Sequence, residues 1–365
     1  MSAGWLRHFT FACYFQMPRS PRCPRFPARI TWRNAATSAL SLILLSGCTE
    51  ANASAIAGPE PGIPAGSPPI RTFSNPLAGT RLFVEPGSHA ARQAAEWRRS
   101  RPADAAQMDK IAAQSHAVWF VDYHQRPYAA VREATTRIRG AGALPVFVLY
   151  RIPNRDCGQH SAGGATGAAE YQAWIGEVAA GIGSERAMVV LEPDALAGMD
   201  CLSSEHRTAR LEQIRAAVRK LKSQGNIAVY IDAGNPGWLR AGEMADRLLR
   251  AGVEEADGFA LNVANFFTNE ENLGYGSEIS SLVGGKHFVI DSSRNGAGAD
   301  PARHWCNPSN RALGTKPTVD TGHSLVDGFL WLHVPGQSDG QCNGGPAPGT
   351  WWADYALGLA QRSNI

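Results

Sequence analysis

The chain has 365 residues, and its formal net charge of +3 is concentrated in one stretch. Residues 1–47 contain six arginines and no acidic residue, so the rest of the chain carries 29 basic and 32 acidic side chains. This balance leaves no basic surface for nucleic acid. With 44% hydrophobic and 18% charged residues overall, the composition is typical of a globular protein and excludes a largely disordered one.

The first 47 residues have the features of an export signal. Their arginines precede an apolar run at residues 39–45, which is too short to span a bilayer. The sequence LSGC at residues 45–48 resembles a bacterial lipobox, in which cleavage precedes Cys48 and its thiol is lipidated, although a plain signal peptide ending in cysteine is the alternative. Met17 is a second candidate start. We therefore expect an exported protein, either secreted or anchored to the membrane at the cell surface through Cys48.

Residues 48–74 are rich in Ala, Gly and Pro, which predicts a linker, and one domain follows over residues 75–365. Short runs of apolar and β-branched residues in that domain predict parallel strands that are covered on both faces. These runs lie at residues 81–85, 117–122, 144–151, 187–192, 227–232, 258–263, 287–291 and 328–333. Amphipathic patterns between them predict helices at residues 103–114, 127–140, 168–182, 204–222 and 241–252.

About eight repeats of strand and helix favour a βα-barrel. An open, doubly wound sheet is the alternative, but no Gly-x-Gly-x-x-Gly motif follows an early strand. Four cysteines remain in the domain, and an even number in an exported protein favours two disulfides, whereas no Cys-x-x-Cys or His-x-x-x-His spacing supports a metal site. Pairing in sequence order would close loops of about 45 and 37 residues, each contributing about 4 kcal/mol.

The carboxyl ends of the predicted strands are rich in acids and aromatic residues. Because barrel enzymes carry their chemistry at these ends, paired carboxylates with interleaved Trp and Tyr suit glycoside hydrolysis, although any single acid could instead be a cap or a surface ion pair. The polar and aromatic residues at these ends are Asp122, Tyr150, Asp156, Glu192, Asp194, Asp232, Trp238, Asn262, Asn265, Asp291, Arg294 and Asp339.

Seven motifs, in order, resemble glycoside hydrolase family 6 cellulases. They are RIPNRDCG at residues 151–158 with SAGG at 161–164, LEPD at 191–194, YIDAGNPGW at 230–238, NVANF at 262–266, IDSSRNG at 290–296, WCNP at 305–308 and WLHVPGQSDG at 331–340. The resemblance implies a distorted βα-barrel with seven strands instead of eight, without indicating which predicted strand is surplus. It also implies hydrolysis of β-1,4-glucan with inversion, no metal or organic cofactor, and disulfides joining Cys157 to Cys201 and Cys306 to Cys342.

Residue roles follow from matched positions. Asp194 resembles the general acid, Asp156 the acid that supports its proton and helps activate water, Asp339 the candidate base, and Tyr150 the tyrosine beneath the distorted sugar. The resemblance implies substrate contacts for Trp119, Asp232, Trp238, Asn262, Asn265, Arg294 and Trp305. His333 and Gln337 stand where the family usually has Lys and Glu, so the subsite that they line differs in charge.

We expect an endoglucanase acting on cellulose or a related β-glucan or its oligosaccharides, and we expect a monomer. Only 36 positions separate Cys306 from Cys342, which leaves little room for the long loops that roof the cleft in chain-end enzymes of the family. A cellobiohydrolase is nevertheless one alternative. Another is a cell-surface carbohydrate-binding lipoprotein with reduced or lost catalysis, which the two departures at His333 and Gln337 motivate.

Overall fold

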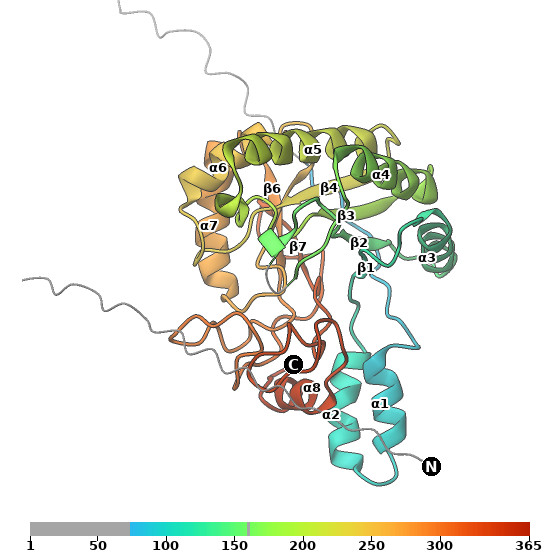
Figure 1. Cartoon of the computed structure of the whole chain (residues 1–365). Helices are drawn as coiled ribbons and strands as arrows, with labels where there is room; N and C mark the ends of the chain where they lie inside the picture. Colours follow the sequence, from blue (N-terminus) through green and yellow to red (C-terminus); the bar gives the residue numbers. More distant parts are fainter. Residues whose placement is uncertain (1–73, 159–160) are drawn as a thin grey trace, which may run out of the picture. The chain divides into compact units, whose positions relative to one another are not determined.

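Seven parallel strands form one sheet, in which the spatial order of the strands is their order in the sequence (Figure 1). The computed structural model describes residues 74–158 and 161–365; the signal, Cys48 and nearly all of the predicted linker lie outside them. The strands are β1 (Val118–Phe120), β2 (Val146–Leu149), β3 (Ala187–Leu191), β4 (Ile227–Asp232), β5 (Gly258–Leu261), β6 (His287–Asp291) and β7 (Val326–Leu330). The expected α/β fold with a distorted seven-stranded barrel is therefore confirmed.

Five helices connect successive strands and cover the outside of the sheet. They are α3 (Tyr128–Gly140), α4 (Ala168–Ile182), α5 (Ser204–Lys222), α6 (Ala241–Arg250) and α7 (Asn269–Leu282). The first four match the predicted helices to within two residues at each end. The last was not predicted, although Thr268 and Glu271 form a capping box at its start, which is a signal visible in the sequence.

The barrel has two apolar layers because side chains alternate along each strand. In β2 and β3, Phe147, Leu149 and Val189 pack outward against helices, whereas Val148 and Met188 belong to the cluster that fills the interior. In the described residues no ladder pairs β1 with β7. Their edges are joined by the Ala117 N–H, which donates to the Trp331 carbonyl at 2.9 Å. The barrel is therefore closed by isolated contacts.

The surplus strand is residues 81–85. This segment makes one isolated parallel bridge, between Leu82 and Leu144, and forms no ladder. The prediction of a strand there is wrong because β1 and β3 already occupy both edges of β2. Its bridge reaches Leu144, which precedes the first residue of β2.

Among the described residues, no helix has both the length and the apolarity that are needed to cross a bilayer.

Three further helices pack together at one end of the molecule, away from the helices that surround the sheet (Figure 1). They are α1 (His89–Trp97), α2 (Pro102–Ala112) and α8 (Ala353–Gln361), and they share an apolar cluster with Leu313 and Trp331. The C-terminal helix is also held by Lys110, whose ammonium group donates to the Ala360 carbonyl at 3.2 Å. The early and late parts of the chain therefore depend on each other for burial.

We predict that Leu359→Ala lowers the free energy of unfolding by about 2–5 kcal/mol, because the Leu359 side chain is fully buried in this cluster and its loss leaves a cavity. Gln361→Ala, at an exposed position two residues later, should change it by less than about 0.5 kcal/mol. Urea unfolding followed by tryptophan fluorescence measures both. Equal effects of the two substitutions would contradict the assignment of α8 to a core.

Candidate active site

Several of the polar residues predicted at the strand ends lie close together at the carboxyl ends of the strands. Asp194 lies in the turn after β3 with φ +67°, a backbone conformation that places its carboxyl group beside the end of β2. Its backbone N–H donates to Asp232 Oδ2 at 2.9 Å, and the Tyr150 hydroxyl lies 3.5 Å from Asp194 Oδ2. Burial raises the pKa of Tyr150, so its hydroxyl stays protonated and donates to Asp194.

The Asp194 carboxyl group holds a proton unusually well. Burial, and then the negative charge of Asp156, raise its pKa to about 6, although the Tyr150 hydrogen bond and the Arg155 charge both lower it. The charge of Asp339 acts on it in the same direction as that of Asp156. A carboxyl group that is still partly protonated near pH 6 can serve as a general acid.

The loop that carries Asp156 is braced by Arg155. The Arg155 guanidinium donates to Asp122 at 2.8 and 3.2 Å and to the Tyr150 carbonyl at 2.6 Å, and it lies 4.3 Å from the centre of the Tyr150 ring. Asp156 itself has φ +50° and accepts a hydrogen bond from the Ser161 N–H at 2.7 Å. These contacts fix the end of β2 and the loop that carries Asp156.

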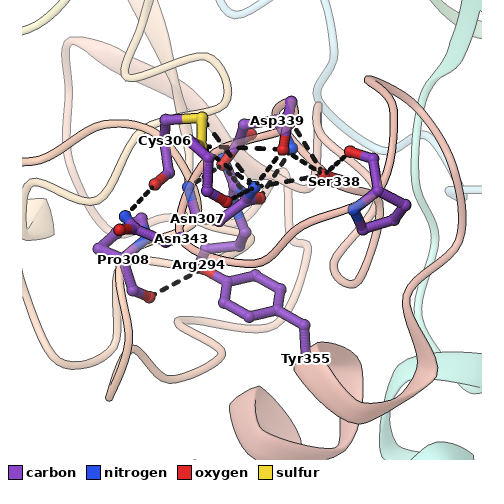
Figure 2. Close-up of a disulfide and its surroundings, with 11 residues drawn as sticks. Arg294, Cys306, Asn307, Pro308, Ser338, Asp339, Asn343 and Tyr355 are labelled. Atoms are coloured by element: carbon purple, nitrogen blue, oxygen red, sulfur yellow. Dashed lines mark hydrogen bonds and ion pairs between the residues drawn. A yellow bond between two sulfur atoms is a disulfide. The ribbon is translucent and has the colours of Figure 1, made fainter.

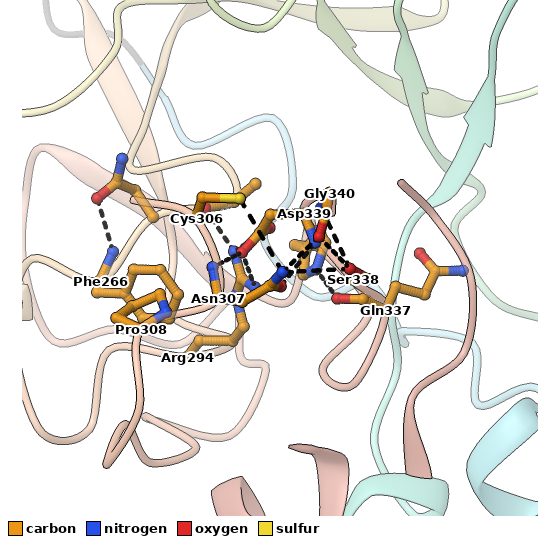
Figure 3. A network of polar contacts seen from close by, with 12 residues as sticks. Phe266, Arg294, Cys306, Asn307, Pro308, Gln337, Ser338, Asp339 and Gly340 are labelled. Atoms are coloured by element: carbon orange, nitrogen blue, oxygen red, sulfur yellow. Dashed lines mark hydrogen bonds and ion pairs between the residues drawn. The ribbon is translucent and has the colours of Figure 1, made fainter. Parts of the chain in front are cut away.

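Asp339 is held in place by hydrogen bonds with Arg294 and Asn307 (Figures 2 and 3). The buried Arg294 guanidinium donates to both carboxylate oxygens at 2.9 and 3.0 Å, and the Asn307 N–H donates to Oδ2 at 2.9 Å. In return, the Asp339 N–H donates to Asn307 Oδ1 at 2.8 Å. Although burial alone would lower it, the Asp339 charge raises the pKa of Arg294. The candidate base therefore has a rigid position beside the Cys306–Cys342 disulfide.

Comparison with known proteins identifies the family. The model of the family described as "Glycosyl hydrolases family 6" matches residues 77–363. The chain belongs to this family. It is 41% identical over 291 residues to Endoglucanase A of Cellulomonas fimi, covering 79% of this chain and 62% of that protein. It is 38% identical over 308 residues to Endoglucanase A of Thermobispora bispora, covering 82% and 65%. The chain thus spans less than two thirds of either relative.

A solved structure also resembles this family 6 chain. The endoglucanase of Mycobacterium tuberculosis, solved in complex with methyl-cellobiosyl-4-deoxy-4-thio-β-D-cellobioside, superposes with a TM-score of 0.76 at 43% identity. The match covers 80% of this chain and 100% of that one. The two chains therefore share a fold over the whole length of the Mycobacterium tuberculosis chain.

Two disulfides join the predicted cysteines of the family 6 domain. Cys157 bonds to Cys201, and Cys306 bonds to Cys342. The first links the Asp156 loop to the short 3-10 helix η2 (Met199–Cys201) that follows the Asp194 turn. The second links the Asn307 loop to the residues just after Asp339 (Figure 2). Each disulfide thus secures a loop that holds one of the predicted catalytic acids.

The aromatic residues predicted to contact substrate remain accessible to different degrees. Trp238 and Trp305 each have 45% of their surface exposed, so part of each side chain is accessible to solvent. Trp119 is partly buried; its indole N–H donates to the Leu332 carbonyl at 2.7 Å, and its ring meets the Tyr150 ring edge-on. Asn265 is partly exposed, and its side-chain oxygen accepts from the Phe266 N–H.

Three other predicted substrate contacts are buried and bind protein groups instead. Asn262 bonds to the Asp291 carbonyl and to the backbone of Phe267, and Arg294 is occupied by Asp339. Asp232 has 1% of its surface exposed and accepts from the Asp194 and Gly234 N–H groups, while its Oδ1 has no partner in the structure. A substrate contact by any of the three stays a prediction.

The two departures from the family pattern give a neutral subsite wall. Burial, and then the charge of Arg294, lower the pKa of His333 to about 3. Above about pH 3 the ring is therefore mostly uncharged, whereas a lysine would be cationic in neutral solution. Its Nε2 lies 3.3 Å from the Gln337 carbonyl. The Gln337 amide points away from the cluster around Asp339 (Figure 3). Protonation of His333 thus requires a pH well below the pKa of Asp194.

We predict that replacing Cys157 and Cys201 together by serine lowers both stability and activity. The loss of a 44-residue cross-link should remove up to about 4 kcal/mol of stability, and the freed loop carries Asp156. Peptide mass mapping of the unreduced wild type should recover both pairs. Thermal unfolding and hydrolysis of soluble glucan then compare this variant with the matching Cys306/Cys342 double serine. Free thiols at all four positions would contradict the pairing.

Proposed function

We propose that this chain hydrolyses internal β-1,4-glucosidic bonds of cellulose or a related β-glucan with inversion of configuration. The observation that carries the proposal is the setting of Asp194, whose carboxyl group lies 3.5 Å from the Tyr150 hydroxyl and whose pKa is raised by burial and by the charge of Asp156. The endoglucanases to which the chain is similar, and the cello-oligosaccharide analogue bound to one of them, support this reaction and substrate class.

In the proposed mechanism, Asp194 protonates the oxygen of the leaving sugar while water attacks the opposite face of the ring. Asp339, held by Arg294 and Asn307, acts as the base for that water, and Asp156 supports the proton on Asp194. Tyr150 lies beneath the sugar that becomes positively charged. Inversion needs acid and base carboxyls about 6.5–9.5 Å apart, which leaves room for the water. No step requires a metal or an organic cofactor.

Cleavage within chains is favoured over release from chain ends. The segment closed by the Cys306–Cys342 disulfide spans only 36 positions, and the partly exposed Trp238 suits an open cleft. A cellobiohydrolase is the second enzymatic candidate. A carbohydrate-binding protein without turnover is favoured only by the neutral His333 and Gln337, and the intact set of three acids argues against it.

The location of the activity is part of the same proposal. The two disulfides support an oxidising, extracellular compartment. We infer that the exported chain is anchored through a lipid on Cys48, or is released from the cell if the signal is of the plain type. The catalytic domain would act as a monomer on β-glucan near the cell surface.

Asp194→Asn should reduce hydrolysis of carboxymethylcellulose by about 10²–10⁴-fold and leave cello-oligosaccharide binding nearly unchanged, because the amide has the shape of the acid but cannot donate its proton. Reducing-sugar release and calorimetric binding of cellotetraose measure the two effects. The control is Asp246→Asn, an exposed acid on α6, which should match the wild type. Substantial turnover by Asp194→Asn on unactivated glucan would remove Asp194 from the acid role.

The mode of cleavage has its own test. An endoglucanase should lower the viscosity of carboxymethylcellulose long before many reducing ends accumulate. Each internal cut divides a chain into two much shorter chains but creates only one new reducing end. Proton NMR of cellohexaose hydrolysis should show the α-anomer of the new reducing end first, since inversion converts the β-bond. If many reducing ends accumulate while the viscosity stays high, as chain-end release would produce, the cellobiohydrolase alternative is favoured.

A further inference from the structure

The loop that carries Asp156 and the turn that carries Asp194 are joined by a buried acid. Glu192 follows β3 and has 1% of its surface exposed. Its carboxylate accepts hydrogen bonds from the Arg151 N–H at 2.8 and 3.1 Å and from the Ile152 N–H at 2.8 Å. Both donors lie at the start of the Asp156 loop, so Glu192 binds the end of β3 to the end of β2.

A buried cation joins the same two segments from another side. Arg210 extends from α5 with 3% of its surface exposed. Its guanidinium donates to the Pro153 and Asn154 carbonyls at 2.8 and 2.9 Å, and to the Ala195 carbonyl at 3.0 Å. One planar group thus binds two carbonyls just before Asp156 and one just after Asp194.

Both segments need such external support because of their backbone conformation. Asn154, Asp156 and Cys157 have φ between +49° and +54°, and Glu192 and Asp194 have φ of +53° and +67°. Asn and Asp tolerate this region better than other residues with a side chain, whereas Cys157 and Glu192 keep it only where the surroundings enforce it. If the bonds to Glu192 or Arg210 were weakened, these segments would relax toward ordinary conformations and carry the two acids with them.

We propose that Arg210 and Glu192 are positioning residues of this active site, which fix Asp156 against Asp194 by binding the loop of one to the turn of the other. Neither side chain touches the substrate in this role. The proposal rests on the proposed general-acid role of Asp194. It adds a reason why that acid keeps its proton: the distance to Asp156 and the exclusion of water are both set by these two contacts.

The pH dependence of Asp194 reflects groups from several elements. Those that face it are Tyr150, Arg155 and Asp156 from the end of β2, Asp232 from β4 and Asp339 from the segment after β7. The charged and titratable side chains that face Glu192 are Arg155, Tyr171 and Arg210. Arg210 and Glu192 contact the backbone of the two segments that carry these acids, so in this proposal they act on Asp194 through position. Substitutions that conserve their charge therefore separate position from direct electrostatics.

Arg210→Lys is the main test. Lysine keeps the positive charge but cannot bind three carbonyls with one planar fork. We expect kcat on carboxymethylcellulose to fall roughly 10- to 100-fold, because small displacements of catalytic groups have effects of this size. We also expect the alkaline limb of the kcat profile to move to lower pH by about half a pH unit, because a more distant Asp156 and more water raise the pKa of Asp194 less.

Glu192→Asp is the second variant. It also conserves the charge, but its side chain is too short to reach the Arg151 and Ile152 N–H groups in the same way. It should therefore move the alkaline limb of the kcat profile to lower pH, as Arg210→Lys does. The control is Arg247→Lys. Arg247 is equally buried and donates to the Leu196 and Ala197 carbonyls, which lie on the Asp194 side alone. It should lose comparable thermal stability while it keeps the wild-type pH profile.

Each outcome decides the proposal. A wild-type kcat and alkaline limb in both charge-conserving variants, with stability lowered as in Arg247→Lys, would show that Arg210 and Glu192 only support the fold. A limb that moves to higher pH would overturn the proposal as well. If Asp194→Asn is inactive while these variants keep the wild-type limb, the positioning proposal fails alone. If Asp194→Asn stays active, the general-acid role fails first.

Discussion

The architecture depends on how backbone N–H groups are satisfied where the parallel strands end. Beyond the last ladder bond the strands diverge, and buried amides there would be left without acceptors. Buried carboxylates fill this need at several strand ends and join the end of one strand to that of a neighbour. Glu192 accepts from the end of β2, Asp232 from the turn after β3, and Asp291 from Ala264 after β5 and from Leu332 and His333 after β7.

This arrangement has an electrostatic consequence that the catalytic chemistry uses. Burial raises the pKa of Glu192 to about 7 and raises the pKa of Asp232 and of Asp291, because carboxylates are poorly solvated there. Asp194 follows Glu192 by two residues and lies in the same poorly solvated region at the strand ends. The general acid thus owes its raised pKa to the environment that the strand ends already create, and Asp156 adds to it.

The sequence predicted the sheet and its connecting helices well because strand and helix periods differ clearly there. The sequence pattern grouped all acids at the strand ends as candidates for the catalytic site, whereas the structure shows that some of them bind the protein backbone. Glu192 and Asp291 bind backbone amides, and Asn262 binds carbonyls, since strand-end position does not reveal which way a side chain turns. Arg210 was missed, although it stands four residues before Ile214 on the buried face of α5, an unusual place for a charge.

The contact between the early helices and α8 orders events during synthesis. Lys110 and its acceptor on Ala360 are 250 positions apart, so the ribosome has almost finished the chain before α2 can bury its apolar face. Until then α2 can pack only against α1, and its contacts with α8 cannot form. The apolar cluster at this end of the domain is therefore completed only when the last residues of the chain are available.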